Sequence, residues 1–450
     1  MKEEVIVIYS RPWFEDYYNY LAEQFSIAFR CKVLLISDYS IVDGENLSPL
    51  KEEIIDQDIT KNLGLQPIES YINDIIARDR LLRDLDYEYS FKVISAYQSK
   101  IKKFISNKKI KFFFSATVDQ FFVDLLFLNA CINKIPFLGY HISVVPGYLL
   151  FSSRGEINPF RKVDDKEVSA AAEKIANPNF RPNYIPSKNK IILTGALNLF
   201  KNILRVYYYK IRNFASKRFN YHFLHNSKNS YFINKFLGLV YQHSIKESQS
   251  LNHDLYIPLQ LHPECNSDYW PRFKHYSSYE DFILNLIKGL HSSVKVVLKE
   301  HPNMIGYREV SFYRNLKQLG AEIVHVEHSN AELINSSKSV LTLNSSVGIE
   351  GLIYNKPIIC LSDPYYKSNF HYSSYEPQLF KDYDANKALK LSVRNTLQCS
   401  HLGTIPDTNY LYKKSSKKKI YNETQQLICT LKSFLKNYHF PNLKNIYTIE

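Results

Sequence analysis

The chain has 450 residues, with 57 Lys and Arg against 44 Asp and Glu, which gives a formal net charge of +13. Hydrophobic residues make up 45% and charged residues 22% of the chain, and these values exclude a chain that is disordered throughout. At roughly 150 residues per domain, the length predicts two or three domains. The 13 glycines also argue against a Gly-rich repeat architecture.

Six cysteines are scattered along the chain without any CxxC pair, which predicts reduced thiols and argues against a disulfide or zinc framework. Near the amino terminus, Glu3 and Glu4 precede the apolar run 5–9, whose length is that of a strand and not of a signal peptide. No window reaches the ~18 apolar residues of a membrane span. We therefore expect a cytoplasmic protein, with peripheral attachment to the inner face of the cell membrane as an open alternative.

Residues 1–145 alternate between strand and helix patterns. Short apolar runs predict strands at 5–9, 32–37, 111–115 and 136–141. Apolar residues at helical spacing predict helices at 13–29, 72–103 and 118–133. Short apolar strands that alternate with helices are typical of a parallel sheet covered on both faces.

Residues 255–400 repeat this alternation. We expect strands at 255–261, 294–299, 322–326, 339–343 and 357–361, and helices at 279–291, 307–319, 331–336 and 347–354. The fold class is therefore α/β, with two Rossmann-like doubly wound domains and an interdomain cleft at the carboxyl ends of the strands. The expected domain ranges are 1–173, 174–250, 251–405 and 406–450, the last being a closing helix and tail.

The segment from Lys174 to Lys246 contains thirteen Lys and Arg and no Asp or Glu. The other 44 bases equal the 44 acids in number, so this segment accounts for the whole net charge. Within it, residues 191–214 read as an amphipathic basic helix. Two interpretations stay open: docking on an anionic membrane surface, and an interdomain excursion with a solvated face. We expect no nucleic-acid partner, because no helix-turn-helix, RRM or KH signature accompanies the bases.

Polar motifs follow three of the predicted strands. Lys299, Glu300, His301 and Pro302 come directly after a strand, where a lysine and an imidazole would lie at the sheet edge. A turn whose polar residues face water would have the same sequence.

The second motif is the run Asn344-Ser345-Ser346, which links a strand to a helix that has Gly348 in its first turn and Glu350 beyond it. Such a helix start offers backbone N–H groups to a phosphate, and Gly348 would let a ligand approach the backbone. An ordinary capped helix needs the same serines. In the third motif, 258–264, His262 and Glu264 are candidate catalytic or donor-binding groups, and an interdomain hinge is the alternative.

The succession PLQLHPE (258–264), KEHP (299–302), Arg308 and TLNSSVGIEGLIYNKPIICL (342–361) resembles glycosyltransferases of bacterial capsule and surface-polysaccharide biosynthesis. The resemblance extends over about residues 255–370, and more loosely over the amino-terminal half. It implies a GT-B transferase in which 251–405 binds the nucleotide-sugar and 1–173 lies on the acceptor side. KEHP with the serine pair is also similar to the His-Pro and Ser-Ser motifs of bacterial sialyltransferases and Kdo transferases, which hold the CMP moiety of the donor.

Carried onto this chain, the resemblance implies that Lys299 and His301 contact the donor nucleotide and that the two serines hold its phosphate. Glu350 matches the acidic residue on the helix after the serines. The whole set expected to bind the donor is Lys299, His301, Arg308, Asn344, Ser345, Ser346, Gly348 and Glu350. One departure concerns the first motif, which reads Leu-His-x-Gln-Pro-Glu in many relatives, whereas Gln260 and His262 occupy exchanged positions here. The role of His262 is therefore open.

Inverting glycosyl transfer needs a base for the acceptor hydroxyl, and positive charge or a helix dipole for the leaving phosphate. The candidate catalytic residues are Asp119, Glu264 and His262, with Asp16 as a competitor of Asp119. Asp119 and Asp16 each also read as an acid at a helix start, and this interpretation is the stronger one.

We expect neither a metal nor a cofactor beyond the nucleotide-sugar co-substrate. Asp382-Tyr383-Asp384 matches an Asp-x-Asp metal motif, but Asp384 precedes a helix and is better explained as its N-cap.

The preferred function is transfer of a sugar from a nucleotide donor, either a CMP-activated acidic sugar such as Kdo or a sialic-acid-like sugar, or a UDP-sugar. The acceptor would be a capsular or lipopolysaccharide glycan, free or lipid-linked. The alternatives are a nucleotide-sugar 2-epimerase of the same fold and a non-catalytic polysaccharide-assembly protein.

Overall fold

A computed structural model shows how these predicted elements are arranged. It describes residues 3–11, 14–41, 43–57, 68–156, 158–176, 204–227, 237–238, 240–241, 244–245, 252–262, 264–271, 278–290, 292–361, 383–403 and 417–447. Residues 191–203 of the predicted basic helix and Asp382 lie outside this part of the chain.

The chain forms two compact units. The first consists of Met1–Val163, Ile211–His225 and Thr396–Glu450, and the second of Asp164–Lys210 and Asn226–Asn395. The chain therefore passes between the units more than once, and the range 174–250 contributes to both. The four domain ranges expected from the sequence stay predictions.

The first unit is built on a sheet with the strand order β12-β6-β5-β4-β1-β2-β3. The five strands from β5 to β3 are parallel, β6 pairs antiparallel with β5, and β12 pairs antiparallel with β6. The strands are β1 (Glu4–Tyr9), β2 (Lys32–Ser37), β3 (Gly44–Asn46), β4 (Lys109–Ala116), β5 (Phe137–Ile142), β6 (Tyr148–Phe151) and β12 (Ser400–Leu402). All four strands predicted in residues 1–145 are thus present.

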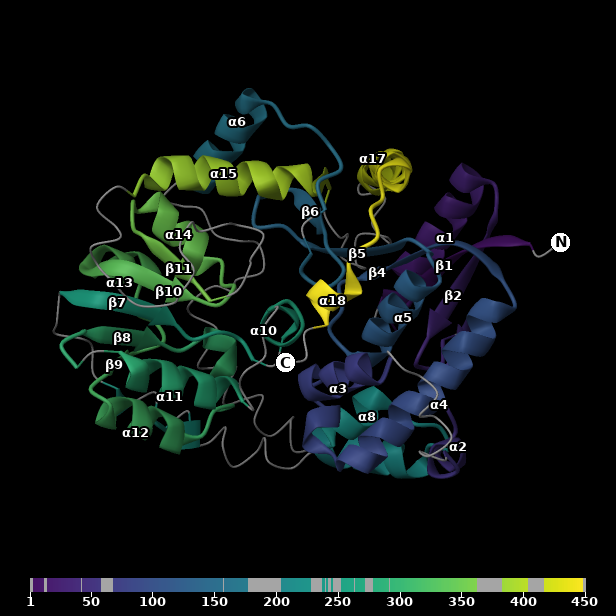
Figure 1. Ribbon diagram of the computed structural model, residues 1–450, viewed down its shortest axis with the longest axis horizontal. Helices are drawn as coiled ribbons and strands as arrows, with labels where there is room; N and C mark the ends of the chain where they lie inside the picture. Colours follow the sequence, from purple (N-terminus) through teal and green to yellow (C-terminus); the bar gives the residue numbers. More distant parts are fainter. Residues whose placement is uncertain are drawn as a thin grey trace. The chain divides into compact units, whose positions relative to one another are not determined.

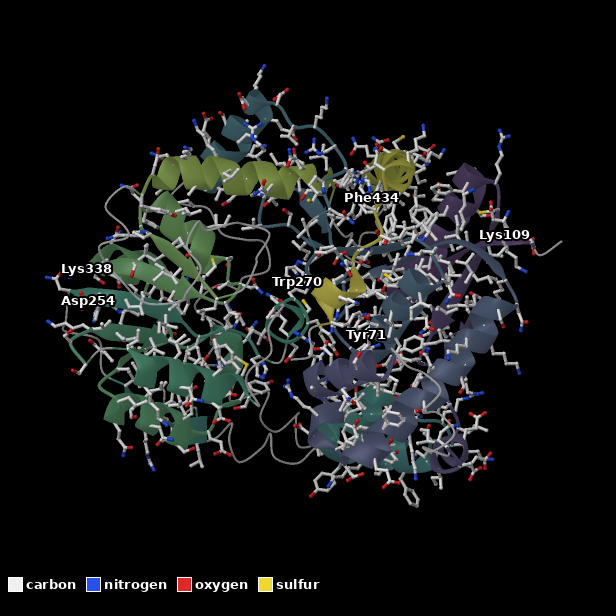
Figure 2. The ribbon with its side chains drawn as sticks, in the orientation of Figure 1. Tyr71, Lys109, Asp254, Trp270, Lys338 and Phe434 are labelled. Carbon is white, nitrogen blue, oxygen red and sulfur yellow. The ribbon has the colours of Figure 1, made fainter. Side chains whose placement is uncertain are left out.

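The helices of this unit are α1 (Glu15–Phe29), α2 (Lys51–Ile55), α3 (Ile68–Arg78), α4 (Tyr87–Ser106), α5 (Phe121–Ile132), α8 (Tyr221–Asn226), α17 (Lys417–Lys436) and α18 (Leu443–Ile446), with a 3₁₀ turn at Leu82–Asp84. They cover both faces of the sheet (Figure 1). On one face, Phe25 of α1 and Leu431 of α17 share a core with Phe114 of β4. Phe434 of α17, labelled in Figure 2, packs its ring 5.5 Å from that of Phe151. A sheet covered on both faces explains why its strands are apolar throughout.

The helix expected at 72–103 is in fact two helices, α3 and α4. The Asp79 side chain follows α3 and accepts hydrogen bonds from the N–H groups of Leu81 (2.8 Å) and Leu82 (3.0 Å). An aspartate that bonds to nearby backbone in this way competes with helix continuation. The expectation of one helix was therefore wrong at this break.

The second unit contains a sheet of five parallel strands in the order β11-β10-β7-β8-β9. The strands are β7 (His253–Pro258), β8 (Val296–Lys299), β9 (Glu322–Val324), β10 (Ser337–Thr342) and β11 (Ile358–Cys360). The helices are α6 (Asp165–Ala176), α10 (Cys265–Asp268), α11 (Tyr279–Gly289), α12 (Val310–Gln318), α13 (Asn330–Ser336), α14 (Val347–Ile353) and α15 (Ala385–Gln398). Figure 1 shows α11 and α12 on one face of this sheet, and α13 and α14 on the other.

Both sheets are doubly wound. In the second unit the chain runs outward from β7 through β8 to β9, and then returns to add β10 and β11 on the other side. In the first unit it runs from β1 through β2 to β3 and returns to add β4 and β5. The switch points, where the winding changes direction, lie between β7 and β10 and between β1 and β4. The expected fold class, α/β with two Rossmann-like doubly wound sheets, is therefore confirmed.

Candidate functional site

The switch point of the second sheet brings two of the predicted motifs together. Gln260 follows β7, and Asn344 follows β10, which is the strand next to it. In open α/β sheets, ligands bind outside the carboxyl ends of the strands at this point. The opposite edge carries different chemistry: Lys338 and Asp254 lie near the amino ends of β10 and β7 and form an ion pair of 2.7 Å (Figure 2).

The Gln260 side chain joins the ends of β7 and β10. Its amide, oriented with the oxygen toward the loop, accepts from the N–H groups of Asn344 (2.7 Å) and Ser345 (2.9 Å). The Asn344 side chain donates to the carbonyl of Asn266 at 2.9 Å. The sequence analysis noted Gln260 only as one of two exchanged positions, and the structure assigns it the role of holding the Asn-Ser-Ser loop.

Ser346 is the N-cap residue of α14, and the Oγ of Ser345 before it accepts from the N–H of Val347 at 3.2 Å. The N–H of Gly348 donates to the Ser345 carbonyl at 3.0 Å. Both bonds are those of an ordinary helix start, so the phosphate-binding roles of Ser345, Ser346 and Gly348 remain predictions. At Gly351 of the same helix, a Cβ would lie 2.3 Å from Cδ1 of Ile358, so a larger residue there would displace the end of that side chain.

Lys299, at the end of β8, belongs to a polar network that reaches Glu350. Its Nζ donates to Oδ1 of Asn330 (2.6 Å) and to the His328 carbonyl (2.7 Å). Nδ2 of Asn330 donates in turn to Oε2 of Glu350 at 3.3 Å, and the Tyr256 hydroxyl also donates to Oδ1 of Asn330. Burial raises the pKa of Glu350, while the Asn330 hydrogen bond and the Lys299 charge lower it by smaller amounts.

Asn330 is a site residue that the motif search missed. It opens α13, which follows β9, the strand next to β8. A search for polar residues after every strand of the sheet, and not only after strands with recognisable motifs, would have found it. Its amide carries both an acceptor for Lys299 and a donor for Glu350, so it fixes the two predicted donor ligands relative to each other.

His301 lies two residues beyond β8 and is half-buried. Its Nδ1 accepts from the N–H of Asn303 at 3.2 Å. Burial, with smaller contributions from the charges of Arg308 and Lys299, lowers the pKa of His301 to about 4. The imidazole is therefore neutral at physiological pH, with its proton on Nε2, and that N–H is a donor suited to a phosphate or hydroxyl oxygen.

Arg308 lies beneath the motifs, where it is 2% exposed. Its guanidinium pairs with Glu300 and, at 2.9 Å, with Glu280. It also donates at 2.5 Å to the Gln260 carbonyl, and the Tyr313 hydroxyl donates to Glu300 at 2.5 Å. These contacts are those of a positioning residue that ties the loop after β7 to the loop after β8. Its expected role as a direct donor ligand stays a prediction.

His262 lies in the loop before α10, and Glu264 lies at the start of that helix. His262 is buried, with Nδ1 3.2 Å from Oγ of Ser267 and 3.6 Å from Oδ1 of Asp268. Its ring stacks on that of Tyr279, with centroids 5.4 Å apart. Glu264 is the N-cap residue of α10 and is partly exposed. Both residues thus lie in the segment that connects β7 to α10. Their contacts do not indicate a catalytic role for either one.

The switch point of the first sheet carries Asp119 and Arg11, which follow β4 and β1 and form an ion pair. Arg80 approaches the same carboxylate at 3.8 Å and donates to the Asp119 carbonyl at 2.8 Å. Asp119 does not cap α5: the Phe121 N–H donates to Asp79 instead, at 2.8 Å. The competitor Asp16 is exposed in the first turn of α1, as a helix-start acid would be.

A second acid at this edge was missed in the sequence. Asp38, which follows β2, is fully buried and accepts from the hydroxyl of Tyr9 (2.7 Å) and from Nε2 of Gln120 (3.3 Å). Burial raises the pKa of Asp38 to about 6.

Among the described residues, no group of three or more His, Cys, Asp or Glu side chains is placed to hold a metal ion. Asp384 accepts from the N–H of Lys387 at 3.0 Å, which confirms it as the expected N-cap of α15. The expectations of no metal and no cofactor remain predictions. In the part of the chain that the structure covers, no helix is both long and apolar enough to cross a bilayer.

A comparison with known protein families finds a match for the part of the chain that forms the second sheet. Residues 211–370 match the model of a family described as capsule polysaccharide biosynthesis protein. That range includes all the strands of the second sheet and every residue predicted to bind the donor. No curated protein matches the chain.

Several solved structures are similar to the chain at low sequence identity. They include KpsC of Thermosulfurimonas dismutans, a beta Kdo 2,7 transferase (12% identity, TM-score 0.31, 66% of this chain and 80% of that chain). The UDP-GlcNAc 2-epimerase of Methanocaldococcus jannaschii is 11% identical (TM-score 0.22, 95% of this chain and 99% of that chain). Anabaena Alr3699/HepE, solved with UDP-glucose, is 10% identical (TM-score 0.23, 96% and 100%).

Proposed function

We propose that the protein is a glycosyltransferase of capsule or surface-polysaccharide biosynthesis that moves a sugar from a nucleotide donor to a glycan acceptor. The observation that carries the proposal is the carboxyl edge of the second sheet. There a lysine and a neutral imidazole follow β8, and a partly buried carboxylate lies on the helix after β10, within the range matched by the family model.

Each of these groups suits one part of a nucleotide-sugar. The ammonium of Lys299 supplies positive charge for the diphosphate or monophosphate of the donor. Nε2–H of His301 donates to a phosphate or sugar oxygen. The carboxylate of Glu350, held through Asn330, accepts hydrogen bonds from ribose hydroxyls.

In the transfer step, the bond between the anomeric carbon and the phosphate oxygen breaks, and the phosphate leaves with the electron pair. The acceptor hydroxyl forms the new bond to that carbon and gives its proton to a base. Lys299 and His301 stabilise the charge that develops on the leaving phosphate. The candidate bases are Asp119, Glu264 and His262, with Asp119 first because an acid at the first sheet's switch point is free of any structural capping role.

The donor class is tested by thermal unfolding of the full chain with CMP, UDP and GDP. We expect one of these nucleotides to raise the unfolding temperature, and Lys299→Met to abolish the increase. Lys338→Met is the matched control, since Lys338 is also in an ion pair but lies at the opposite edge of the same sheet. Stabilisation by CMP would indicate an acidic-sugar donor, and stabilisation by UDP a UDP-sugar.

Product analysis then separates the enzyme classes. A transferase releases nucleotide in proportion to glycan extended, whereas a 2-epimerase converts the nucleotide-sugar with no acceptor present. If no nucleotide stabilises the protein, the transferase proposal is wrong and a non-catalytic assembly role is favoured.

A further inference from the structure

The helix at residues 204–215 turns its apolar side toward solvent. Its large apolar residues recur at spacings of three and four, which places them on one face of a helix. They are exposed to 57% (Leu204), 62% (Tyr207), 53% (Tyr208), 68% (Ile211) and 91% (Phe214). We call these five residues the outer stripe. The boundary between the two units falls within this helix, between Lys210 and Ile211. All five residues of the outer stripe nevertheless belong to the one helix.

The opposite side of the same helix faces the protein. Val206, Tyr209 and Asn213 lie on that side and are only partly exposed. The Asn213 carbonyl accepts from Nζ of Lys51 at 2.5 Å, which attaches this end of the helix to α2. A surface helix of a soluble protein normally packs its apolar face inward. Here five large apolar side chains are exposed although Val206 and Tyr209 face inward, so the outer stripe presents an apolar surface to solvent.

Basic residues flank the outer stripe on both sides. At 100° per residue, Arg205 and Arg212 lie along one margin of the stripe and Lys210 along the other. All three are exposed, and no Asp or Glu occurs anywhere between Lys174 and Lys246. The two arginines also stack on aromatic rings, Arg205 at 5.5 Å from the ring centre of Tyr209 and Arg212 at 5.3 Å from that of Phe223.

We propose that helix 204–215 docks the protein on the surface of a bilayer that contains anionic lipid. The charge pattern selects this partner: exposed aromatic and aliphatic residues between flanking bases are the pattern of a helix that lies in the membrane interface. The stripe enters the region between headgroups and acyl chains, and the bases contact lipid phosphates. This role goes beyond the proposed transferase activity and does not depend on it.

The test is sedimentation of the full chain with vesicles of phosphatidylcholine alone and of phosphatidylcholine with phosphatidylglycerol. We expect the protein to bind the anionic vesicles more strongly. Ile211→Ser with Phe214→Ser should lower the partition coefficient at least about tenfold, because two large apolar side chains no longer enter the interface. The matched control is Ile27→Ser on α1, which removes an equally exposed isoleucine (69%) outside the stripe.

A second pair of variants separates charge from apolar contact. Arg205→Gln with Arg212→Gln should weaken binding to anionic vesicles by about fivefold for each base. Lys109→Gln with Lys338→Gln removes two exposed bases elsewhere in the chain and should leave binding unchanged. All variants should unfold at the wild-type temperature, since every substituted side chain is exposed.

Two results would overturn the proposal. One is equal sedimentation of wild type and stripe variants with anionic vesicles, including no sedimentation of either. The other is a wild-type protein that self-associates in analytical ultracentrifugation while its stripe variants are monomeric and vesicle binding is unchanged. That result would assign the stripe to a second copy of the chain.

Discussion

The five parallel strands of the first sheet are ordered like the five strands of the second, but the two sheets place different chemistry at their switch points. In the first unit, Arg11 and Asp119 form an ion pair across the ends of β1 and β4. In the second unit, Gln260 accepts from the backbone of Asn344 and Ser345 across the ends of β7 and β10. One edge therefore presents a partly exposed carboxylate between guanidinium groups, and the other a network of neutral amides.

The two edges also differ in the exposure and pairing of their acidic residues. In the second unit, Glu300 follows β8 but is buried and paired with Arg308, so Lys299 and His301 remain as the polar groups after that strand. In the first unit, Asp119 stays partly exposed at 21% of its side chain. The first edge therefore keeps an acid partly exposed, whereas the acid that follows β8 in the second unit is neutralised by a buried guanidinium.

The largest expected effect tests Arg308 as the residue that holds the second edge together. Arg308→Leu leaves Glu300 buried without its cation, which should lower the free energy of unfolding by about 3–5 kcal/mol. Chemical denaturation measures this loss. Arg394→Leu, which breaks the exposed pair with Asp165, should cost less than about 1 kcal/mol. Equal losses in the two variants would contradict the positioning role.

The next effect concerns the first edge. Asp119→Asn should lower kcat by about 10²–10⁴-fold, the range of a lost general base, and leave the nucleotide Kd unchanged. Steady-state kinetics and calorimetric titration measure the two quantities. Asp16→Asn is the control, because Asp16 is exposed in the first turn of α1. If Asp119→Asn lost nucleotide affinity but kept kcat, Asp119 would belong to the donor-binding residues and not be the base.

A smaller effect tests Asn330 as the link between Lys299 and Glu350. Asn330→Leu should raise the donor KM about tenfold with a smaller change in kcat. The variant also removes a hydrogen bond that lowers the pKa of Glu350, so that pKa should rise and donor affinity should be lost at a higher pH than in the wild type. Asn315→Leu, at an exposed position of α12, is the control and should keep the wild-type KM and pH profile. An unchanged pH profile in Asn330→Leu would show that Asn330 acts on folding alone.

The smallest effect is an expected absence of titration at His301. Its pKa, about 4, lies below the ordinary value, so the imidazole loses its proton as pH rises through about 4 and stays neutral above. Nucleotide affinity measured by calorimetry should therefore show no step near pH 6.5, the ordinary pKa of histidine. A step at that pH that disappears in His301→Gln would contradict a neutral donor.

Local patterns were sufficient for most of the architecture. The apolar runs that became β1, β4, β8 and β10 were recognisable because a strand buried on both faces needs apolar side chains at successive positions. The helical spacing of apolar residues at 13–29 and 279–291 was equally easy to recognise in the sequence. The break between α3 and α4 was not, because it depends on Asp79, an acid that could equally have faced water.

The motifs of the candidate site were also visible in the sequence, but their connections were not. Lys299, His301 and Glu350 were chosen because polar residues after a strand lie at the sheet edge. The role of Gln260 was missed because its partners Asn344 and Ser345 are 84 and 85 positions away in the chain. Asn330 was missed because Glu350 and Lys299 are 20 and 31 positions away. Only strand order brings such residues together.

The sequence by itself determined the α/β class, the motif-bearing edge of the second sheet and the concentration of all excess charge in one segment. The tertiary structure decided that Arg308 is buried in an ion-pair network and that the outer stripe of helix 204–215 faces solvent. The physical reason is the same in both cases. A residue's type and spacing define which face of an element it occupies, but only the packing of other elements decides whether that face is covered.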